Sequence, residues 1–334
     1  MAATIKDIAK KTGLGLATIS KYLNGGNVRI ENRIAIEEAI KELDFRVNEF
    51  ARGLKTSKSK TIGVIIPELS NLFCTHIITI IEDILRQKGY AIIVCDCRTD
   101  EKLEYEATEF LVNKMVDGII SMPVSRDGTY LELPLAKGIP VVLIDRKVEG
   151  YSVDAVVVDN VSASENAIDH FMKNGHKNIG IICGPKYVFT SEQRLLGYNQ
   201  AFVKRGILPK ESLITYGAYT VESGYECLKK LLNENKDMSA VFVTNYEMTL
   251  GAIIAINELA IKIPEQLSII GFDNMQLSKV VQPKLTIVSQ PIAQIAEHVA
   301  NIMLKRLCCS DIDGAATINL STELIMGDSV QNKY

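Results

Sequence analysis

The sequence predicts a small all-α head of helix-turn-helix type, followed by an α/β body with parallel sheets. Within the first 45 residues, short amphipathic segments are separated by glycine-bearing turns. From Thr61 onward, short apolar runs alternate with amphipathic segments, which is typical of buried parallel strands covered by helices on both faces. The 274 residues after Lys60 are enough chain for two such sheets.

Charge is distributed unevenly along the 334 residues. The net charge is -3, yet residues 1–60 hold 12 Lys and Arg against 7 Asp and Glu, and the remaining chain holds 25 against 33. A basic head on an acidic body is typical of a polyanion-binding module joined to a domain with another function. Charge alone leaves a solvated basic surface equally open.

Composition and motifs exclude several classes of protein. No apolar run approaches the roughly 18 residues of a membrane span, and the N-terminus becomes charged at Lys6 without the apolar core of a signal peptide. Seven cysteines without a C-x-x-C motif fit a reducing compartment, so we expect a cytoplasmic protein with no membrane contact. Nucleotide-binding, hydrolase and metal-ligand motifs are missing, so we expect no catalytic residues, no metal and no cofactor.

The head reads as three helices. Thr4 and Asp7 have capping-box spacing, so the first helix is expected to begin at Ile5 and to end at Gly13, which tolerates a left-handed backbone. A third amphipathic helix is expected over 31–43. Two short helices across a glycine-bearing turn, a third helix and a basic charge indicate a helix-turn-helix module, whose second helix enters a major groove. An unrelated three-helix bundle is the alternative.

The second helix is expected over 16–23, and its two sides differ. Its apolar side is formed by Leu16, Ile19 and Leu23. Its outward side is formed by Ala17, Thr18, Lys21 and Tyr22. After the head, the segment 47–55 is long enough for about two helical turns and contains Gly53. It is too short to form a stable helix alone.

The body is expected to alternate strands and helices. Strands are predicted over 61–66, 91–95, 118–121, 140–144, 155–158, 179–183, 240–243, 267–271 and 285–288. Helices are predicted over 72–88, 101–114, 161–174, 191–205, 221–234, 247–259 and 292–308. Asp145, Asn245 and Asp273 directly follow strands, and because ligands of open α/β sheets bind beyond the carboxyl ends of strands, we expect these three in one crevice. Each could instead cap a helix, Asn245 above all.

An ordered series of motifs resembles the LacI/GalR family of transcription regulators. It consists of TIKDIAK at 4–10, TISKYLNG at 18–25, ARGLK at 51–55, TIGVIIP at 61–67, VDGII at 116–120, IPVVLIDR at 139–146, GHKNIG at 175–180 and SIIGFDN at 268–274. The resemblance implies a two-lobed body similar to periplasmic sugar-binding proteins, with the chain crossing between lobes near Asn160, Gln290 and Leu320. The implied domains are a DNA-binding head (1–46), a hinge helix and linker (47–60), an N-terminal effector lobe (61–160 plus 291–320) and a C-terminal effector lobe (161–290 plus 321–334).

The outward face of the second helix, together with the resemblance, predicts the contacts with DNA. Base edges are assigned to Leu16, Ala17 and Lys21, and phosphates to Thr4, Thr18 and Ser20. Further DNA contacts are expected from Asn24, Arg52, Leu54 and Lys55. In the family the segment holding Leu54 becomes helical on DNA and pushes this leucine into the minor groove; without the resemblance, a flexible linker is the preferred reading.

The resemblance also implies an effector site. Its polar groups are Asp145, Arg146, Arg194, Asn245 and Asp273, and its walls are Leu72, Phe73, Thr190 and Tyr219. This set of groups suits a polyol: the carboxylates accept hydrogen bonds from hydroxyls, Arg and Asn donate hydrogen bonds, and an aromatic face covers the apolar side of a sugar ring. Asp145, Arg146, Arg194 and Asp273 sum to zero charge, which argues against a phosphorylated effector. The family commonly has Asp where this chain has Tyr246.

These observations predict a ligand-responsive, DNA-binding transcription regulator and not an enzyme. It is expected to be a repressor of carbohydrate-utilisation genes that binds a pseudo-palindromic double-stranded DNA operator as a homodimer, with a sugar as effector. The alternative is a cytosolic sugar-binding or sugar-modifying α/β protein whose basic head docks a protein partner.

Overall fold

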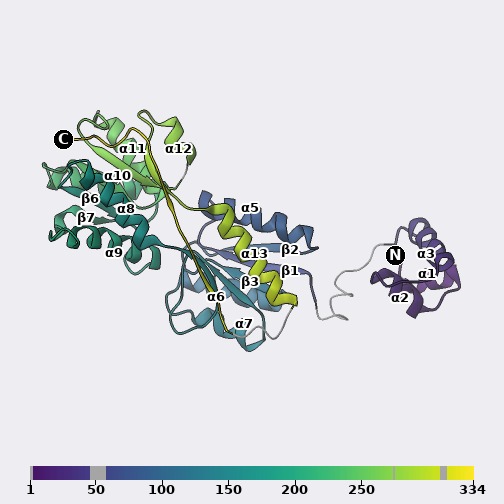
Figure 1. Ribbon diagram of the computed structural model, residues 1–334. Coiled ribbons are helices and arrows are strands. Elements are labelled where there is room, and N and C mark those ends of the chain that lie inside the picture. Colours follow the sequence, from purple (N-terminus) through teal and green to yellow (C-terminus); the bar gives the residue numbers. More distant parts are fainter. Residues whose placement is uncertain (1–2, 46–57, 274, 309–313) are drawn as a thin grey trace. The chain divides into compact units, whose positions relative to one another are not determined.

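The computed structural model describes residues 3–45, 58–273, 275–308 and 314–334. The chain forms two compact units, residues 1–60 and 61–334. The first, the head, contains α1 (Ile5–Thr12), α2 (Leu16–Leu23) and α3 (Ile30–Glu42) (Figure 1). The second, the body, contains two six-stranded sheets.

The head is built around a small core. Ile8, Ile19, Ile36 and Ala39 are buried at its centre, one or two from each helix. The Asp7 carboxylate accepts hydrogen bonds from the backbone N–H and the hydroxyl of Thr4 at 2.8 and 2.7 Å, so the predicted cap at the start of α1 is confirmed. Three helices with so few buried side chains bury little apolar area, so caps matter to the stability of this unit.

The two sides of α2 differ from the sequence prediction at two residues. Leu16 is 46% exposed at the first position of α2, directly after the turn that joins α1 to α2. Tyr22 packs against the head core, and its hydroxyl donates to Glu37 Oε1 of α3 at 2.8 Å. The assignments of Leu16 to the inward side and of Tyr22 to the outward side are therefore wrong: Tyr22 ties α2 to α3, and Leu16 is free to meet a ligand.

The first sheet of the body has the strand order β11-β5-β4-β3-β1-β2, and all of its pairs are parallel. Its strands are β1 (Thr61–Ile66), β2 (Ala91–Asp96), β3 (Gly118–Ser121), β4 (Val141–Ile144), β5 (Asp154–Val158) and β11 (Thr317–Leu320). The elements that cover it are α5 (Leu72–Gln87), α6 (Glu101–Asn113), η1 (Thr129–Leu131), α7 (Glu132–Ala136) and α13 (Ile292–Cys308). We call this sheet and its helices the first lobe.

The second sheet has the order β12-β10-β9-β8-β6-β7, and it is parallel except for the pair β10–β12. Its strands are β6 (Ile179–Cys183), β7 (Ile214–Tyr216), β8 (Ala240–Val243), β9 (Ser268–Phe272), β10 (Thr286–Ser289) and β12 (Glu323–Ile325). Its helices are α8 (Asn160–Lys173), α9 (Phe189–Val203), η2 (Glu211–Leu213), α10 (Val221–Glu234), α11 (Tyr246–Glu258) and α12 (Met275–Val280). This is the second lobe, and together the two lobes confirm the predicted fold class.

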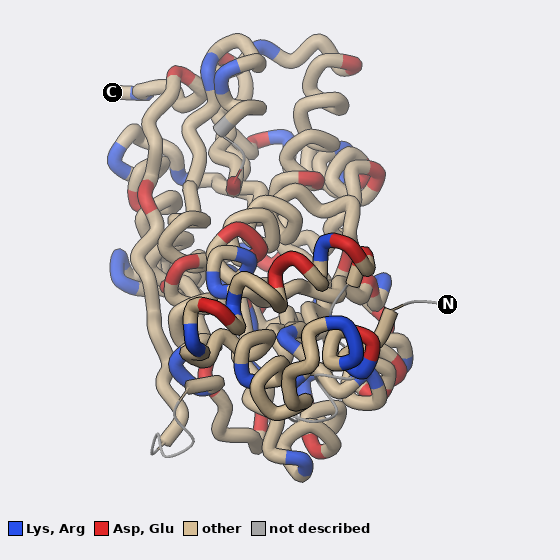
Figure 2. The backbone as a smooth tube through the Cα atoms, turned by 90° about the vertical axis from the view of Figure 1, so that its right-hand side faces the viewer, with Lys and Arg blue, Asp and Glu red and all other residues tan. Residues whose placement is uncertain are grey.

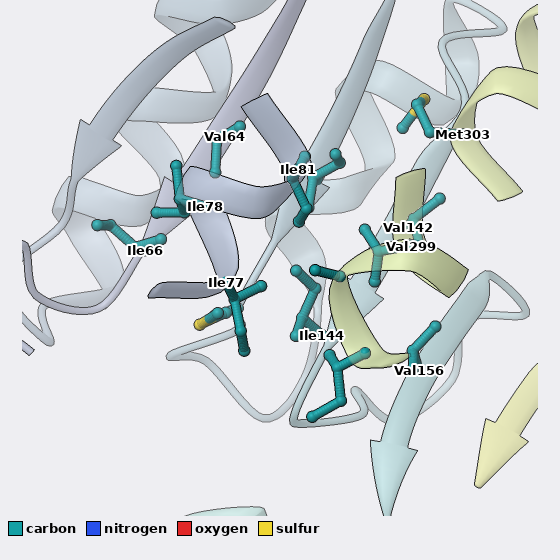
Figure 3. Packing of buried hydrophobic residues seen from close by; sticks show 14 of the residues in the cluster. Val64, Ile66, Ile77, Ile78, Ile81, Val142, Ile144, Val156, Val299 and Met303 are labelled. Atoms are coloured by element: carbon teal, nitrogen blue, oxygen red, sulfur yellow. The ribbon is translucent and has the colours of Figure 1, made fainter. Parts of the chain in front are cut away.

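Each sheet is covered on both faces, which explains why its strands read as continuous apolar runs. In the first lobe α5 and α13 lie side by side on one face (Figure 1), and α6 with η1 covers the other. Figure 3 shows the first of these layers, where Ile77, Ile78 and Ile81 of α5 meet strand and α13 side chains. In the second lobe α10 and α11 cover one face, and α8 and α9 the other.

Three connections carry the chain between the lobes. They run from β5 to α8, from β10 to α13 and from β11 to β12. Because α13 belongs to the first lobe although it follows β10 of the second, neither lobe is a continuous stretch of chain. The carboxyl ends of β4, β8 and β9 carry the residues of the site described next.

Candidate functional site

The predicted DNA-contacting residues of α2 lie where a ligand can reach them. Leu16, Ala17 and Lys21 are exposed, and Thr18 and Ser20 are half-buried. Lys21 has no ion-pair partner among the described residues, so its charge is available. Basic and acidic positions of the head can be followed in Figure 2.

Two further predicted DNA contacts are already engaged within the head. Thr4 uses its hydroxyl proton on Asp7, so a phosphate contact requires that proton to be redirected. Asn24 ends α2, and its amide donates to the Ser20 carbonyl at 2.8 Å. Arg52, Leu54 and Lys55 lie outside the described residues.

The three predicted strand-end residues meet in one cleft of about 80 Å³ in the body. Asp145 follows β4, Asn245 follows β8 and Asp273 follows β9. Asn245 also caps α11, since its Oδ1 accepts from the Met248 N–H at 3.0 Å. The two readings of Asn245 are therefore compatible, because a side chain at a helix start can cap the helix and still face the cleft.

Arg194 is the most firmly held side chain of the cleft. It is 5% exposed near the start of α9, and its Nε donates to Asn160 Oδ1 at 2.7 Å. A second nitrogen donates to the Thr244 carbonyl, and the guanidinium carbon lies 3.7 Å from the centre of the Phe272 ring. Arg194 is thus fixed in place before any ligand arrives.

Asp273 and Gln290 form a hydrogen-bonded pair at the base of the cleft. Gln290 Nε2 donates to Asp273 Oδ2 at 2.8 Å, while Gln290 Oε1 is buried without a partner. Burial raises the pKa of Asp273 to about 6, although the Arg194 charge and the Gln290 hydrogen bond act in the opposite direction. The free Oε1 of Gln290 is an acceptor that a bound molecule can satisfy.

Asp145 and Arg146 form the opposite side of the cleft. Arg146 Nε lies 3.5 Å from Asp145 Oδ2, and a terminal nitrogen of Arg146 donates to the Pro123 carbonyl at 2.9 Å. Asp145 Oδ1 is buried without a partner. Together with Gln290, the cleft thus offers two buried oxygens that lack hydrogen-bond donors.

The cleft walls agree with the sequence prediction at three of four residues. Phe73, Thr190 and Tyr219 line the cleft, and the hydroxyls of Thr190 and Tyr219 are 3.1 Å apart. The Tyr219 ring lies so close to Gly184 that any Cβ at Gly184 would overlap it. Leu72 does not line the cleft: it opens α5 and is 39% exposed, because neighbouring residues of a helix point about 100° apart.

Sequence reasoning missed several residues that line the same cleft. Asn71 Nδ2 of the first lobe donates to Glu247 Oε1 of the second at 2.9 Å, and Asn245 Nδ2 donates to Glu247 Oε2 at 2.6 Å. Burial is the main reason that the pKa of Glu247 is raised. Their places in the sequence could have indicated these two residues, because Asn71 caps α5 and Glu247 lies two residues after Asn245.

The charge of the cleft also differs from the prediction. Besides Asp145 and Asp273, the lining contains Glu68 and Glu247, whereas Arg146 and Arg194 are the cations among the described lining residues. Four carboxylates against two guanidiniums replace the expected balance of zero. The added carboxylates strengthen the argument against a phosphorylated effector in this cleft.

Among residues 3–45, 58–273, 275–308 and 314–334, no group of three or more His, Cys, Asp or Glu side chains is placed to hold a metal ion. In the same part of the chain, no helix combines the length and the apolar character that a membrane span requires.

Comparison with known proteins gives a consistent result. The profile of the bacterial regulatory proteins of the lacI family matches residues 4–48, and that of the periplasmic binding protein-like domain matches residues 168–330. Catabolite control protein A of Priestia megaterium is 33% identical over 94% of this chain and 96% of that protein. The HTH-type transcriptional repressor PurR of Haemophilus influenzae (strain PittEE) is 32% identical over 99% of both chains.

Solved structures agree in fold. A transcriptional regulator CelR-cellobiose complex has a TM-score of 0.75 at 25% identity and covers 98% of this chain and 99% of that one. The Lac repressor dimer bound to operator and the anti-inducer ONPF has a TM-score of 0.89 at 22% identity and covers 99% and 100%. The relatives confirm the prediction of a DNA-binding transcription regulator that is not an enzyme, and a head that docks a protein has no support in these comparisons. This chain belongs to the LacI family of bacterial regulatory proteins.

Proposed function

We propose that this regulator is a repressor of carbohydrate-utilisation genes whose effector is a sugar bound in the cleft. The observation that carries the proposal is the pair of buried oxygens without donors, Asp145 Oδ1 and Gln290 Oε1, on two residues that line the same cleft as Tyr219. Sugar hydroxyls supply donors to such oxygens, and a tyrosine ring covers the apolar face of a pyranose. The similar CelR structure, a complex with cellobiose, supports this chemistry.

The proposed effector contacts are residues that line the cleft. Asp145, Asn245 and Asp273 accept or donate at the strand ends, Arg146 and Arg194 donate from opposite sides, and Phe73, Thr190 and Tyr219 form walls. Gln290 joins this set. Because each lobe supplies part of the binding energy, the affinity for the effector depends on the relative position of the two lobes.

On the DNA side, the proposal is a homodimer on a pseudo-palindromic operator, acting in the cytoplasm where the chromosome lies. One helix of eight residues reads few bases, whereas a two-fold dimer doubles the contacts and places half-sites about one helical turn apart. The similar Lac repressor structure is a dimer on operator. Leu16, Ala17 and Lys21 are proposed to meet base edges, with phosphate contacts from Thr4, Thr18 and Ser20.

To test the proposed DNA contacts, genomic fragments that bind the wild-type chain are selected and sequenced, and the selection is then repeated with Lys21→Ala. Lys21 is exposed and uncommitted, so its removal is expected to change which base is preferred at one position of each half-site, with about 1–3 kcal/mol of discrimination lost per base contact. Competition binding against single-base variants of the selected site measures this change.

Lys137→Ala is the matched control, because Lys137 is an exposed lysine of the body. It is expected to leave both affinity and preference unchanged. If Lys21→Ala weakens binding to all sequences by the same factor, Lys21 contacts a phosphate and the base-reading assignment is wrong.

A further inference from the structure

A second cavity of about 220 Å³ adjoins the effector cleft. Its walls come from both lobes: the segments that follow β3 and β4 in the first lobe, and the start of α9 in the second. Arg146 and Val188 line both the cleft and this cavity, so the two spaces share a wall. Of the residues predicted to bind effector, only Arg146 lies among the described residues that line it.

One side of the second cavity is aromatic. Tyr187 is 73% exposed, and Phe189 and Val148 extend the apolar surface. Tyr187 has a backbone φ of 69°, a conformation that costs free energy for a tyrosine and is retained mainly where the surroundings require it. An exposed aromatic ring at a cavity edge is a surface on which the C–H face of a pyranose packs.

The facing side is polar and joins the two lobes. Arg126 donates from Nε to Glu149 Oε1 at 2.8 Å and from a terminal nitrogen to Glu192 Oε1 at 3.1 Å. Arg126 and Glu149 belong to the first lobe and Glu192 to α9 of the second. Arg146 and Lys147 also line the cavity, so its described lining holds three cations against the two carboxylates. Arg126 and its two carboxylate partners offer both donors and acceptors to the hydroxyls of a sugar.

The cavity floor is held by a buried acid. Glu104 of α6 is fully buried, and its carboxylate accepts from the N–H groups of Val124 and Ser125 at 2.7 and 3.0 Å. Arg146 fixes the Pro123 carbonyl of the same segment. The floor is therefore positioned before a ligand binds, as in a preformed site.

We propose that the second cavity is a subsite for a second sugar ring, so that the effector is a disaccharide whose first ring occupies the cleft and whose second ring packs on Tyr187. The inference rests on the proposed function, which assigns a sugar to the cleft. It adds a group of ligand contacts, Arg126, Tyr187 and Glu192, that the cleft alone does not contain. Because Glu192 and Arg126 lie on different lobes, the second ring would bridge them.

The test is calorimetry on the full chain with a panel of disaccharides, their component monosaccharides and the corresponding sugar phosphates. At least one disaccharide is expected to bind about tenfold or more tighter than either of its monosaccharides, since stacking and a few hydrogen bonds are worth about one factor of ten. Tyr187→Ala is expected to remove most of this advantage while changing the affinity for the monosaccharide less than about twofold.

Two further variants make the result specific. Tyr187→Phe keeps the ring and is expected to retain the advantage of the disaccharide. Tyr105→Ala removes a tyrosine of α6 that is also exposed, at 49%, and that is absent from the described lining of both spaces; it is expected to change nothing. Because Tyr187 and Tyr105 are both exposed, both alanine variants should fold.

Three outcomes overturn the proposal. They are monosaccharides binding as tightly as every disaccharide, a sugar phosphate binding better than both, and Tyr187→Ala weakening monosaccharide and disaccharide equally. Binding of no sugar at all overturns it together with the sugar effector. Fragment selection tests the DNA-binding regulator separately, so a failure of the subsite is distinguishable from a failure of the proposed regulator.

Discussion

Left-handed backbone at non-glycine residues is concentrated around the two adjoining spaces. Of the ten described non-glycine residues with positive φ, Thr99, Asp145, Tyr219 and Asp273 line the cleft and Tyr187 lines the second cavity. Asp tolerates this conformation better than Tyr or Thr, because its short side chain can hydrogen-bond locally. Such residues persist where surrounding contacts hold them, and here five of the ten line the cleft or the second cavity.

Among single residues, Asp273 is expected to make the stability of the folded protein depend on pH. Burial raises its folded-state pKa to about 6, above its ordinary value, with Arg194, Gln290 and Asp145 as the charged or hydrogen-bonding groups that act on it. A raised carboxyl pKa means that its contribution to stability is fully present below about pH 4 and is lost as the pH rises through 6. At neutral pH the buried, ionised carboxylate of Asp273 therefore lowers the free energy of unfolding.

We therefore expect Asp273→Asn to gain stability relative to the wild type between pH 4 and pH 7, by up to about 2–3 kcal/mol. Urea unfolding of both chains at pH 4, 5, 6 and 7 measures the difference. Glu234→Gln, which makes the same carboxyl-to-amide change at an exposed position at the end of α10, is the control. A pH-independent difference for Asp273→Asn would show that its burial does not control its ionisation.

At the scale of elements, the packing of α10 on α11 depends on two glycines. A Cβ at Gly224 of α10 would overlap the backbone of Met248, and a Cβ at Gly251 of α11 would overlap the carbonyl oxygen of Val221. Backbone on one helix therefore lies directly against backbone on the other. The contact also positions Asn245 and Glu247, since both lie at the start of α11.

We expect Gly251→Ala to lower the free energy of unfolding by about 1–3 kcal/mol or more, because close-packed backbone has to move apart. Asn257→Ala on the exposed face of the same helix is the control, and it should be neutral or slightly stabilising because alanine favours helix. Urea unfolding followed by circular dichroism measures both. Equal stability of Gly251→Ala and wild type would mean that the helices separate without cost.

Sequence patterns were sufficient for long elements and insufficient for short ones. The caps and periodicity predict α1, α2 and the strand β1 with their observed bounds. The sequence patterns do not predict the three-residue strands β7 and β12 or the five-residue helix α7, because so few residues show no period. Helix α9 begins at Phe189, two residues earlier than predicted, which brings Thr190 into its first turn.

The candidate site was predictable where a residue ends a strand, and unpredictable where it depends on distant chain. Asp145, Asn245 and Asp273 follow from the rule for carboxyl ends of parallel strands. Glu247 meets Asn71 from 176 positions away, a pairing that no local pattern contains. The same holds for Arg126 and Glu192, which are 66 positions apart.

At the scale of the whole body, two polar contacts join the two lobes beside the cleft and the second cavity. They are the hydrogen bond between Asn71 and Glu247 and the ion pair between Arg126 and Glu192. The ion pair joins exposed groups and is worth little by itself. A ligand that bonds to both lobes can therefore outweigh these contacts and shift how the lobes sit against each other.

We expect this shift to change operator affinity in the dimer, by a factor of about 5 to 150, the range of ordinary coupling energies. The measurement is an operator titration of wild type with and without the tightest sugar found by calorimetry, followed by the same titration with Arg194→Ala. Arg194 is buried in the cleft and held by Asn160 and the Thr244 carbonyl, so its loss should abolish both sugar binding and the response. Arg205→Ala, which removes a surface ion pair with Asp169 just beyond α9, should retain both. Coupling is refuted if the sugar binds wild type, fails to bind Arg194→Ala, and leaves the operator affinity of wild type unchanged, because occupancy of the cleft would then have no effect on the head.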